Sequence, residues 1–231
     1  MTIVILRSET TKDLLNRTAT ELLVLSTTKV GDNALVVHTL SREWGRRGFL
    51  VRSARKTGTT LFLPLNILEA DVLENSKSEL WSLRNIVLKD GMPGIRGNLQ
   101  KNTMTLFLAE VLLRTLREGV NEDGLYEWCV GSILTLNALE SDFANFPVRF
   151  LLELAGALGF RPSFDDIAPF AGEHLPQMKA LLDADFGPSM LLPLNGVTRN
   201  ALCEELLRYL SYHTDSNIQI KSLAILRELY R

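Results

Sequence analysis

The order of apolar and polar positions divides the chain into two parts with different periods. From residue 21 to about 89, short runs rich in apolar and β-branched residues alternate with turn signals such as GDN and NSKS. Five such runs predict five strands that form a small barrel. The spacing fits a five-stranded, partly open barrel of the oligonucleotide-binding (OB) type, and it fits other small barrels too.

A boundary is predicted at GMPGIRGN, which holds three glycines and a proline. Beyond it the period is helical: KNTMTLFLAEVLLRTLRE places Met104, Leu108 and Leu112 on one stripe, with Asn102 or Thr103 as the N-cap. The later segment RPSFDDIAPFAG is expected to be a loop. Further helices are predicted at 123–140, 147–158, about 173–184, 198–213 and 220–230.

These patterns predict an α+β, multidomain chain, with an N-terminal barrel followed by a mostly α-helical domain. The expected parts are an N-terminal extension at 1–16, the barrel at 17–90, a linker at 91–98 and the helical domain at 99–231. The sixteen-residue extension is either an added strand or the result of a wrongly chosen start.

Composition narrows the class of protein. The chain is 46% hydrophobic and 23% charged, which is ordinary for a globular protein. No apolar run approaches the roughly 20 residues of a membrane span, and no signal-peptide cleavage site follows the N-terminus. We therefore expect a cytoplasmic protein without a membrane partner. Cys129 and Cys203 lie in predicted helices, where buried free thiols are expected rather than a disulfide.

The charge is distributed unevenly. The formal net charge is −2, but residues 1–60 carry a net charge of +5 and residues 61–231 a net charge of −7. The positive charge concentrates in SREWGRRGFLVRSARK, residues 41–56, at the turn between the second and third predicted strands. We expect the two parts of the chain to meet different partners.

Catalytic and metal-binding patterns are missing from the sequence. There is no phosphate-binding loop or dinucleotide fingerprint, and no His or Cys pair has zinc-ligand spacing. The acidic pair Glu204 and Glu205 is adjacent in sequence, so the two side chains diverge on a helix. His38 lies in an apolar strand, where a packed or hydrogen-bonded imidazole is expected. The sequence therefore predicts neither an enzyme nor a bound cofactor.

The basic turn has two interpretations. Its charges could simply be solvated and keep a sheet edge from aggregating. However, they continue along the following strand, and Trp44 and Phe49 lie among them, so that a base could stack while arginines hold phosphates. Phe49, at the start of a strand, is better explained as core. The candidate nucleic-acid-binding residues are Arg42, Trp44, Arg46, Arg47, Arg52, Arg55 and Lys56.

Several segments, in this order, resemble the bacterial recombination mediator family RecO. They are ELLVLSTTKVGDNALVVHTLSREWGRRGFLVRSARK, LFLPLNILEADVLENSKSELWSLRNI, FPVRFLLELAGALGFRP and ALCEELLRYLSYHTDSNIQIKSLAILREL. The resemblance covers nearly the whole chain from about residue 17. Arg46 corresponds to the family's Gly-Arg turn, and Arg52, Arg55 and Lys56 correspond to its basic strand end. Ser53 stands where the family commonly has glycine.

The resemblance implies an OB fold, a helical domain and a non-enzymatic role in recombinational DNA repair in the bacterial cytoplasm, at the nucleoid. The family binds and anneals single-stranded DNA and, with RecR, helps load RecA onto DNA coated by single-stranded-DNA-binding protein. Many members hold zinc with four cysteines after the Leu-Gly-x-x-Pro segment. Residues 163–200 here contain no cysteine, so no metal is expected.

The resemblance also implies a groove in the helical domain for the acidic, hydrophobic-ended tail of single-stranded-DNA-binding protein. Arg114, Arg117 and Arg149 are candidates for this contact by charge and position, although each also fits a solvated helix residue. A different function remains open beside the mediator role. The protein could be a non-enzymatic interaction scaffold whose basic barrel face binds an acidic protein, and oligonucleotides would then bind weakly.

Overall fold

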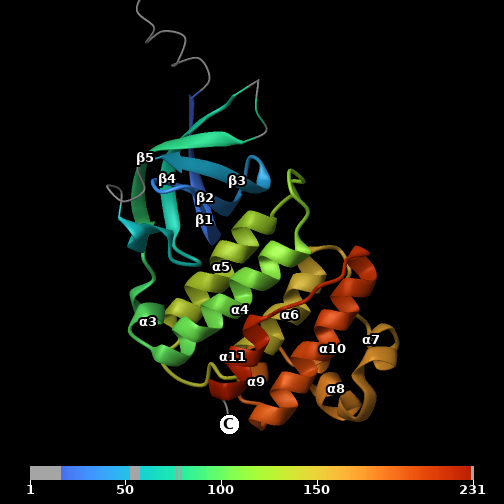
Figure 1. Ribbon diagram of the computed structural model, residues 1–231. Helices are drawn as coiled ribbons and strands as arrows, with labels where there is room; N and C mark the ends of the chain where they lie inside the picture. Colours follow the sequence, from blue (N-terminus) through green and yellow to red (C-terminus); the bar gives the residue numbers. More distant parts are fainter. Residues whose placement is uncertain (1–16, 53–57, 76–77, 79, 230–231) are drawn as a thin grey trace, which may run out of the picture.

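The computed structural model describes residues 17–52, 58–75, 78 and 80–229, with a β-barrel at one end and helices at the other (Figure 1). Its strands close in the order β1-β2-β3-β5-β4. This confirms the prediction of a five-stranded, OB-like barrel followed by a helical part. The strands are β1 (Arg17–Val30), β2 (Ala34–Ser41), β3 (Gly45–Arg52), β4 (Ile67–Leu73) and β5 (Trp81–Asp90).

The barrel closes because one long strand serves two neighbours. In β1, Leu23 pairs with Leu40 of β2 and with Ile67 of β4, and the register against β2 shifts between Val24 and Ser26. A bulge of this kind bends a strand and increases its twist, which allows a short sheet to curl into a barrel. The seam between β3 and β5 is parallel and short, with two residue pairs: Phe49 with Trp81, and Leu50 with Ser82.

Two hydrophobic cores stabilise the molecule. The barrel encloses the smaller one, in which Phe49 is fully buried, as the sequence predicted. The larger core fills the helical part and extends into the barrel, where it takes in Leu23, Leu25, Leu40 and Leu65. The end of the barrel that faces the helices is therefore part of the helical core, and α4 packs directly against β1.

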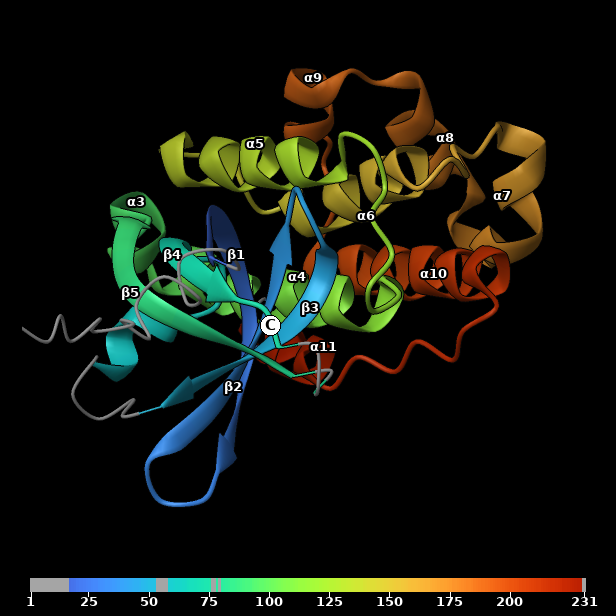
Figure 2. The same cartoon turned by 90° about the horizontal axis from the view of Figure 1, so that it is seen from above.

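Nine labelled α-helices follow the barrel within the described residues (Figures 1 and 2). None of these helices is both long and apolar enough to cross a membrane. They are α3 (Pro93–Arg96), α4 (Leu99–Thr115), α5 (Leu125–Ala138), α6 (Phe146–Ala157), α7 (Phe164–Ala171), α8 (Leu175–Asp183), α9 (Phe186–Met190), α10 (Gly196–Thr214) and α11 (Ser222–Leu229). Short 3₁₀ turns lie at η1 (Thr59–Phe62) and η2 (Gly172–His174).

One predicted helix boundary and one predicted loop were wrong, each for an identifiable reason. Helix α4 begins earlier than predicted because Asn98, not Asn102 or Thr103, is its N-cap: the Asn98 side chain accepts a hydrogen bond from the backbone N–H of Lys101 at 3.1 Å. The segment predicted as the loop RPSFDDIAPFAG contains α7, whose start is fixed by a capping box between Ser163 and Asp166.

The segment 91–98 joins the two parts closely. It contains α3, and Ile95 is fully buried. The guanidinium of Arg96 donates to Asn66 Oδ1 at 2.8 Å beside the barrel and to Asn102 Oδ1 at 2.7 Å in α4, and also to the carbonyl of Pro64. Because one planar cation satisfies acceptors on both sides, the junction is held by specific bonds as well as by the shared core.

Both cysteines are buried free thiols, which confirms that prediction. Burial raises the pKa of Cys203 to about 12, because a buried thiolate would lose its hydration.

Candidate nucleic-acid interface

The basic turn is the end of a regular hairpin that lies against the helical part. Strands β2 and β3 pair in register up to Ser41 and Gly45, as the sequence predicted. Gly45 has a φ of 59°, and a Cβ there would collide with the backbone carbonyl of Val120 in the segment between α4 and α5. Glycine is therefore required both by the backbone conformation and by the close approach. Figure 2 shows this hairpin ending beside α5.

Arg46 makes contacts that join the barrel to the helical part. Its Nε donates to the carbonyl of Leu116 at 2.7 Å, and its guanidinium lies 3.5 Å from a carboxylate oxygen of Glu118. The backbone N–H of Gly119 donates to the carbonyl of Arg46 at 2.9 Å. Only 16% of the Arg46 side chain is exposed, so most of its surface is buried where the barrel meets the helical part.

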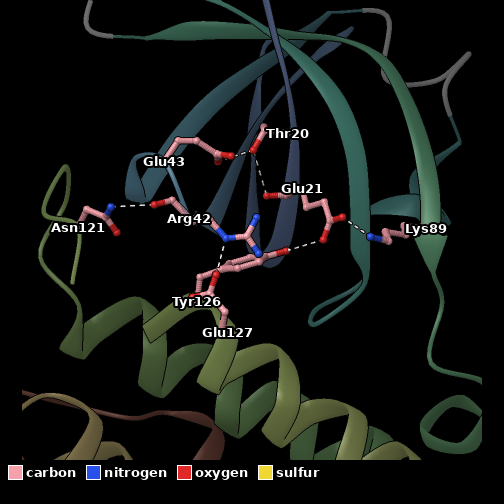
Figure 3. A network of polar contacts seen from close by, with 8 residues as sticks. All are labelled: Thr20, Glu21, Arg42, Glu43, Lys89, Asn121, Tyr126 and Glu127. Atoms are coloured by element: carbon pink, nitrogen blue, oxygen red, sulfur yellow. Dashed lines mark hydrogen bonds and ion pairs between the residues drawn. The ribbon is translucent and has the colours of Figure 1, made fainter. Parts of the chain in front are cut away.

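Arg42 is also engaged by the helical part (Figure 3). Its guanidinium bonds to Glu127 of α5 and lies 5.3 Å from the ring centre of Tyr126, while the Asn121 side chain donates to the Arg42 carbonyl at 2.7 Å. The bond raises the pKa of Arg42 and lowers that of Glu127, because each charge is stabilised by the other. More than half of the Arg42 side chain stays exposed.

The network around Arg42 contains more acid than base (Figure 3). Glu43 accepts a hydrogen bond from Thr20, and Glu21 bonds to Lys89 of β5. The Tyr126 hydroxyl donates to Glu21 at 3.5 Å. Burial and the nearby Glu21 carboxylate raise the pKa of Tyr126, so it keeps its proton. This side of the turn is therefore less favourable for a phosphate than the number of arginines suggests.

Arg47 and Trp44 belong to an aromatic cluster next to the short seam between β3 and β5. The guanidinium carbon of Arg47 lies 3.7 Å from the ring centre of Trp81. Trp44 packs edge to face against Trp81, with ring centres 5.7 Å apart, and against Phe49, with centres 6.1 Å apart. Trp44, Arg47 and Trp81 are all partly exposed.

The remaining candidates lie further along β3. Arg52 is its last residue and is exposed. Arg55 and Lys56 lie outside the described residues. The structure thus brings Trp44 and Arg47 together at Trp81, whereas Arg46 turns toward the helical part. It also adds three residues that sequence reasoning missed: Trp81, Glu118 and Glu127. Trp81 could have been found, because the OB strand order places the start of β5 beside β3.

The three arginines proposed for partner contacts lie in three separate pockets. Arg114 borders an apolar groove between β1, α4 and α11, and Arg117 lines a cleft near α10, where it donates to the Thr214 carbonyl at 3.3 Å. Arg149 lines a pocket of 380 Å³ together with Arg161 and apolar walls that include Trp128.

Arg149 is also bound within its own part of the fold. Its Nε lies 2.6 Å from Glu153, and its guanidinium donates to the Ala184 carbonyl at 2.6 Å. Arg149 therefore holds the α6 helix to the end of α8 while it lines the pocket.

Other polar residues are explained by local structure. His38 contacts Thr28 Oγ1 at 3.4 Å, and burial lowers its pKa, so it is a packed imidazole as predicted. Glu204 pairs with Arg227 and Glu205 contacts His174 at 2.9 Å, so these two carboxylates diverge, as expected. Within the described residues, no group of three or more His, Cys, Asp or Glu side chains is arranged to hold a metal ion.

Comparison with known proteins gives consistent matches along the chain. The family described as "Recombination protein O C terminal" matches residues 96–169. The DNA repair protein RecO of Flavobacterium psychrophilum is 26% identical over 234 residues, which cover 91% of this chain and 98% of that protein. The DNA repair protein RecO of Porphyromonas gingivalis is 30% identical over 173 residues, which cover 72% of this chain and 69% of that protein.

Proposed function

The chain belongs to the RecO family of DNA repair proteins, and we propose that it is a recombination mediator that binds and anneals single-stranded DNA. Together with RecR, it helps load RecA onto DNA coated by single-stranded-DNA-binding protein. The protein acts by binding in the bacterial cytoplasm, and it needs no catalytic residue, metal or cofactor.

One observation carries the proposal: β3 of an OB-like barrel presents cations beside partly exposed aromatic rings. Arg47 lies on Trp81, and Arg52 extends from the end of the same strand. Single-stranded nucleic acid is bound by this combination, since cations follow the backbone and rings accept bases without strong sequence preference. Arg42 and Arg46 contribute less, because Glu127 and Glu118 already neutralise part of their charge.

The test is anisotropy of a labelled single-stranded oligonucleotide over a salt series. Wild type is compared with an Arg52→Glu, Arg55→Glu double variant. Loss of two phosphate contacts should weaken binding by more than tenfold and flatten the salt slope by about 1.4, since each contact contributes about 0.7 for single strands. A Lys179→Glu, Arg208→Glu variant, with the same charge change on exposed residues of α8 and α10, is the control.

Equal losses in the two variants would mean that net charge alone governs binding, and the barrel site would be wrong. If wild type itself does not bind oligonucleotides, the scaffold function becomes the better explanation. The basic barrel face would then bind an acidic protein.

For the acidic tail of single-stranded-DNA-binding protein, the pocket beside Arg149 is the best supported of the three. It combines Arg149 and Arg161 with apolar walls formed by residues such as Trp128, Leu152 and Leu182. Asp123 and Glu153 also line it, and Glu153 pairs with Arg149, so Arg161 is the main cation for an acidic ligand. An acidic peptide that ends in a hydrophobic residue needs both features at once.

A further inference from the structure

Trp81 occupies a special position in the barrel. It is the first residue of β5, and it pairs with Phe49 at the short parallel seam between β3 and β5. Along β3, side chains alternate between faces, so Arg47 lies on the same face as the buried Phe49 and Val51. Arg47 is only partly buried, so at this position the inner face of β3 is partly open to solvent. The guanidinium carbon of Arg47 lies 3.7 Å from the ring centre of Trp81.

The Arg47 and Trp81 pair rests on a rigid support. Trp44 stands at 89° to the Trp81 ring and at 68° to Phe49, whose side chain is completely buried. The backbone N–H of Trp44 donates to Ser41 Oγ at 3.2 Å, which fixes the turn that carries this ring. A planar group held in place before a ligand arrives loses little conformational freedom on binding.

The arginines of the turn therefore differ in what they face. Arg42 and Arg46 face carboxylates, Glu127 and Glu118 respectively. Arg47 lies on the ring of Trp81 and is partly exposed. An arginine in that position offers a flat, cationic surface, and unpaired bases stack on guanidinium planes as they do on aromatic rings.

We propose that the Arg47 guanidinium, supported by Trp81, is the surface on which an unpaired nucleobase of the bound strand stacks. This inference rests on the proposed function and identifies which part of the strand the cluster binds: the base at Arg47, with phosphates held elsewhere along β3. Trp81 acts as a positioning residue that holds the planar guanidinium in place.

The test uses the full-length protein, the substitution Arg47→Lys and two probes of equal length. Lysine keeps the charge but not the plane. One probe is a labelled oligo(dT), and the other is a fully abasic strand with the same phosphates. Arg47→Lys should bind oligo(dT) about tenfold more weakly, as expected for one lost stack, and bind the abasic strand as wild type does. Arg208→Lys, the same exchange at an exposed position of α10, is the matched control and should bind both probes as wild type does.

A second readout follows Trp81 directly. Binding of oligo(dT) should quench tryptophan emission, the abasic strand should not, and Trp81→Phe should lose most of the quenching. Tyr212→Ala, which removes an exposed ring from α10, should leave it unchanged.

The possible outcomes separate this inference from the proposed function. If wild type binds both probes equally, or if Arg47→Lys weakens binding to both probes alike, the stacking site is wrong although the protein still binds DNA. If wild type binds neither probe, the proposed function fails, and the inference fails with it.

Discussion

Neighbouring arginines in the sequence SREWGRRG have very different surroundings. Arg46 is mostly buried against the helical part, Arg47 lies on Trp81, and Arg42 is exposed but paired with Glu127. The charge of this turn is therefore only partly available to a ligand. A count of basic residues overstates how strongly the turn attracts a phosphate backbone.

The first prediction concerns Glu127. Glu127→Gln removes the charge that holds Arg42, so single-stranded DNA should bind about threefold more tightly at low salt, with the gain fading at high salt as charges are screened. Fluorescence anisotropy at two salt concentrations checks this. Asp183→Asn, which also removes an exposed acid from an ion pair, is the control. Equal affinities for the two variants would show that Arg42 does not reach the DNA.

The place of the candidate site could be predicted from the sequence, but its contacts could not. Clustered charge and nearby aromatic residues are local in sequence, so residues 41–56 stood out. The partners of Arg42 and Arg46, namely Glu127 and Glu118, lie more than seventy residues further along the chain. Only the packing of the hairpin on the helical part brings them together.

At the level of elements, α11 packs into the helical core through Leu223 and Leu226, and a carboxylate of α4 binds the start of α11. Glu110 accepts hydrogen bonds from the backbone N–H groups of Lys221 at 3.1 Å and Ser222 at 2.8 Å, and from the Ser222 hydroxyl at 2.5 Å. Burial alone would raise the Glu110 pKa, but the bonds from Ser222 and Lys221 outweigh it, and the pKa is lowered. The charged form of Glu110 therefore stabilises the docked helix.

The second prediction follows from that pKa. A depressed pKa in the folded state adds stability above the ordinary value near 4.5, and this stability is lost as the pH falls through the folded value. Glu110→Gln should lower the free energy of unfolding by about 1 kcal/mol at pH 7. The difference from wild type should shrink below pH 4.5.

Urea denaturation at several pH values measures this difference. Glu228→Gln, at an exposed position in α11, is the control. A gap between wild type and Glu110→Gln that stays constant down to pH 3 would contradict a role for the charge.

The elements could be predicted where local signals agreed. Short β-rich runs and turn residues predicted the barrel, and the helical period beyond it predicted α5, α6, α8, α10 and α11 to within a few residues. Helix α7 was missed because Pro169 lies inside it, although the capping box at Ser163 signalled its start. Helix α9 is only five residues long, too short for a periodic pattern to emerge.

At the scale of the whole molecule, the three arginines that are candidates for partner contacts line three different pockets. Arg114 lies at a groove beside the barrel, Arg117 near the end of α10, and Arg149 in the pocket with Arg161. The Arg117 cleft and the Arg149 pocket share Leu125 and so adjoin each other, whereas the Arg114 groove has no lining residue in common with either.

The third prediction selects the Arg149 pocket. Arg161→Ala should weaken binding of an acidic, hydrophobic-ended tail peptide by about tenfold, because a charged hydrogen-bond donor is lost. Arg161 is chosen for substitution because Arg149 also donates to the Ala184 carbonyl, and its loss would disturb the packing of α6 on the end of α8. Calorimetry at low salt measures the affinity, with Arg114→Ala as the control. Weaker binding by Arg114→Ala alone would place the tail in the groove beside β1 instead.

The core that barrel and helices share has a practical consequence for work on fragments. An excised barrel ending near residue 90 would expose Leu23, Leu25, Leu40 and Leu65 to water and leave the acceptors of Arg96 unpaired. Such a fragment would have a newly exposed apolar surface that favours aggregation and non-specific binding. Its precipitation or non-specific binding would therefore give no information about DNA binding by the intact protein. Point substitutions in the intact chain are therefore the sounder route to dissecting this protein.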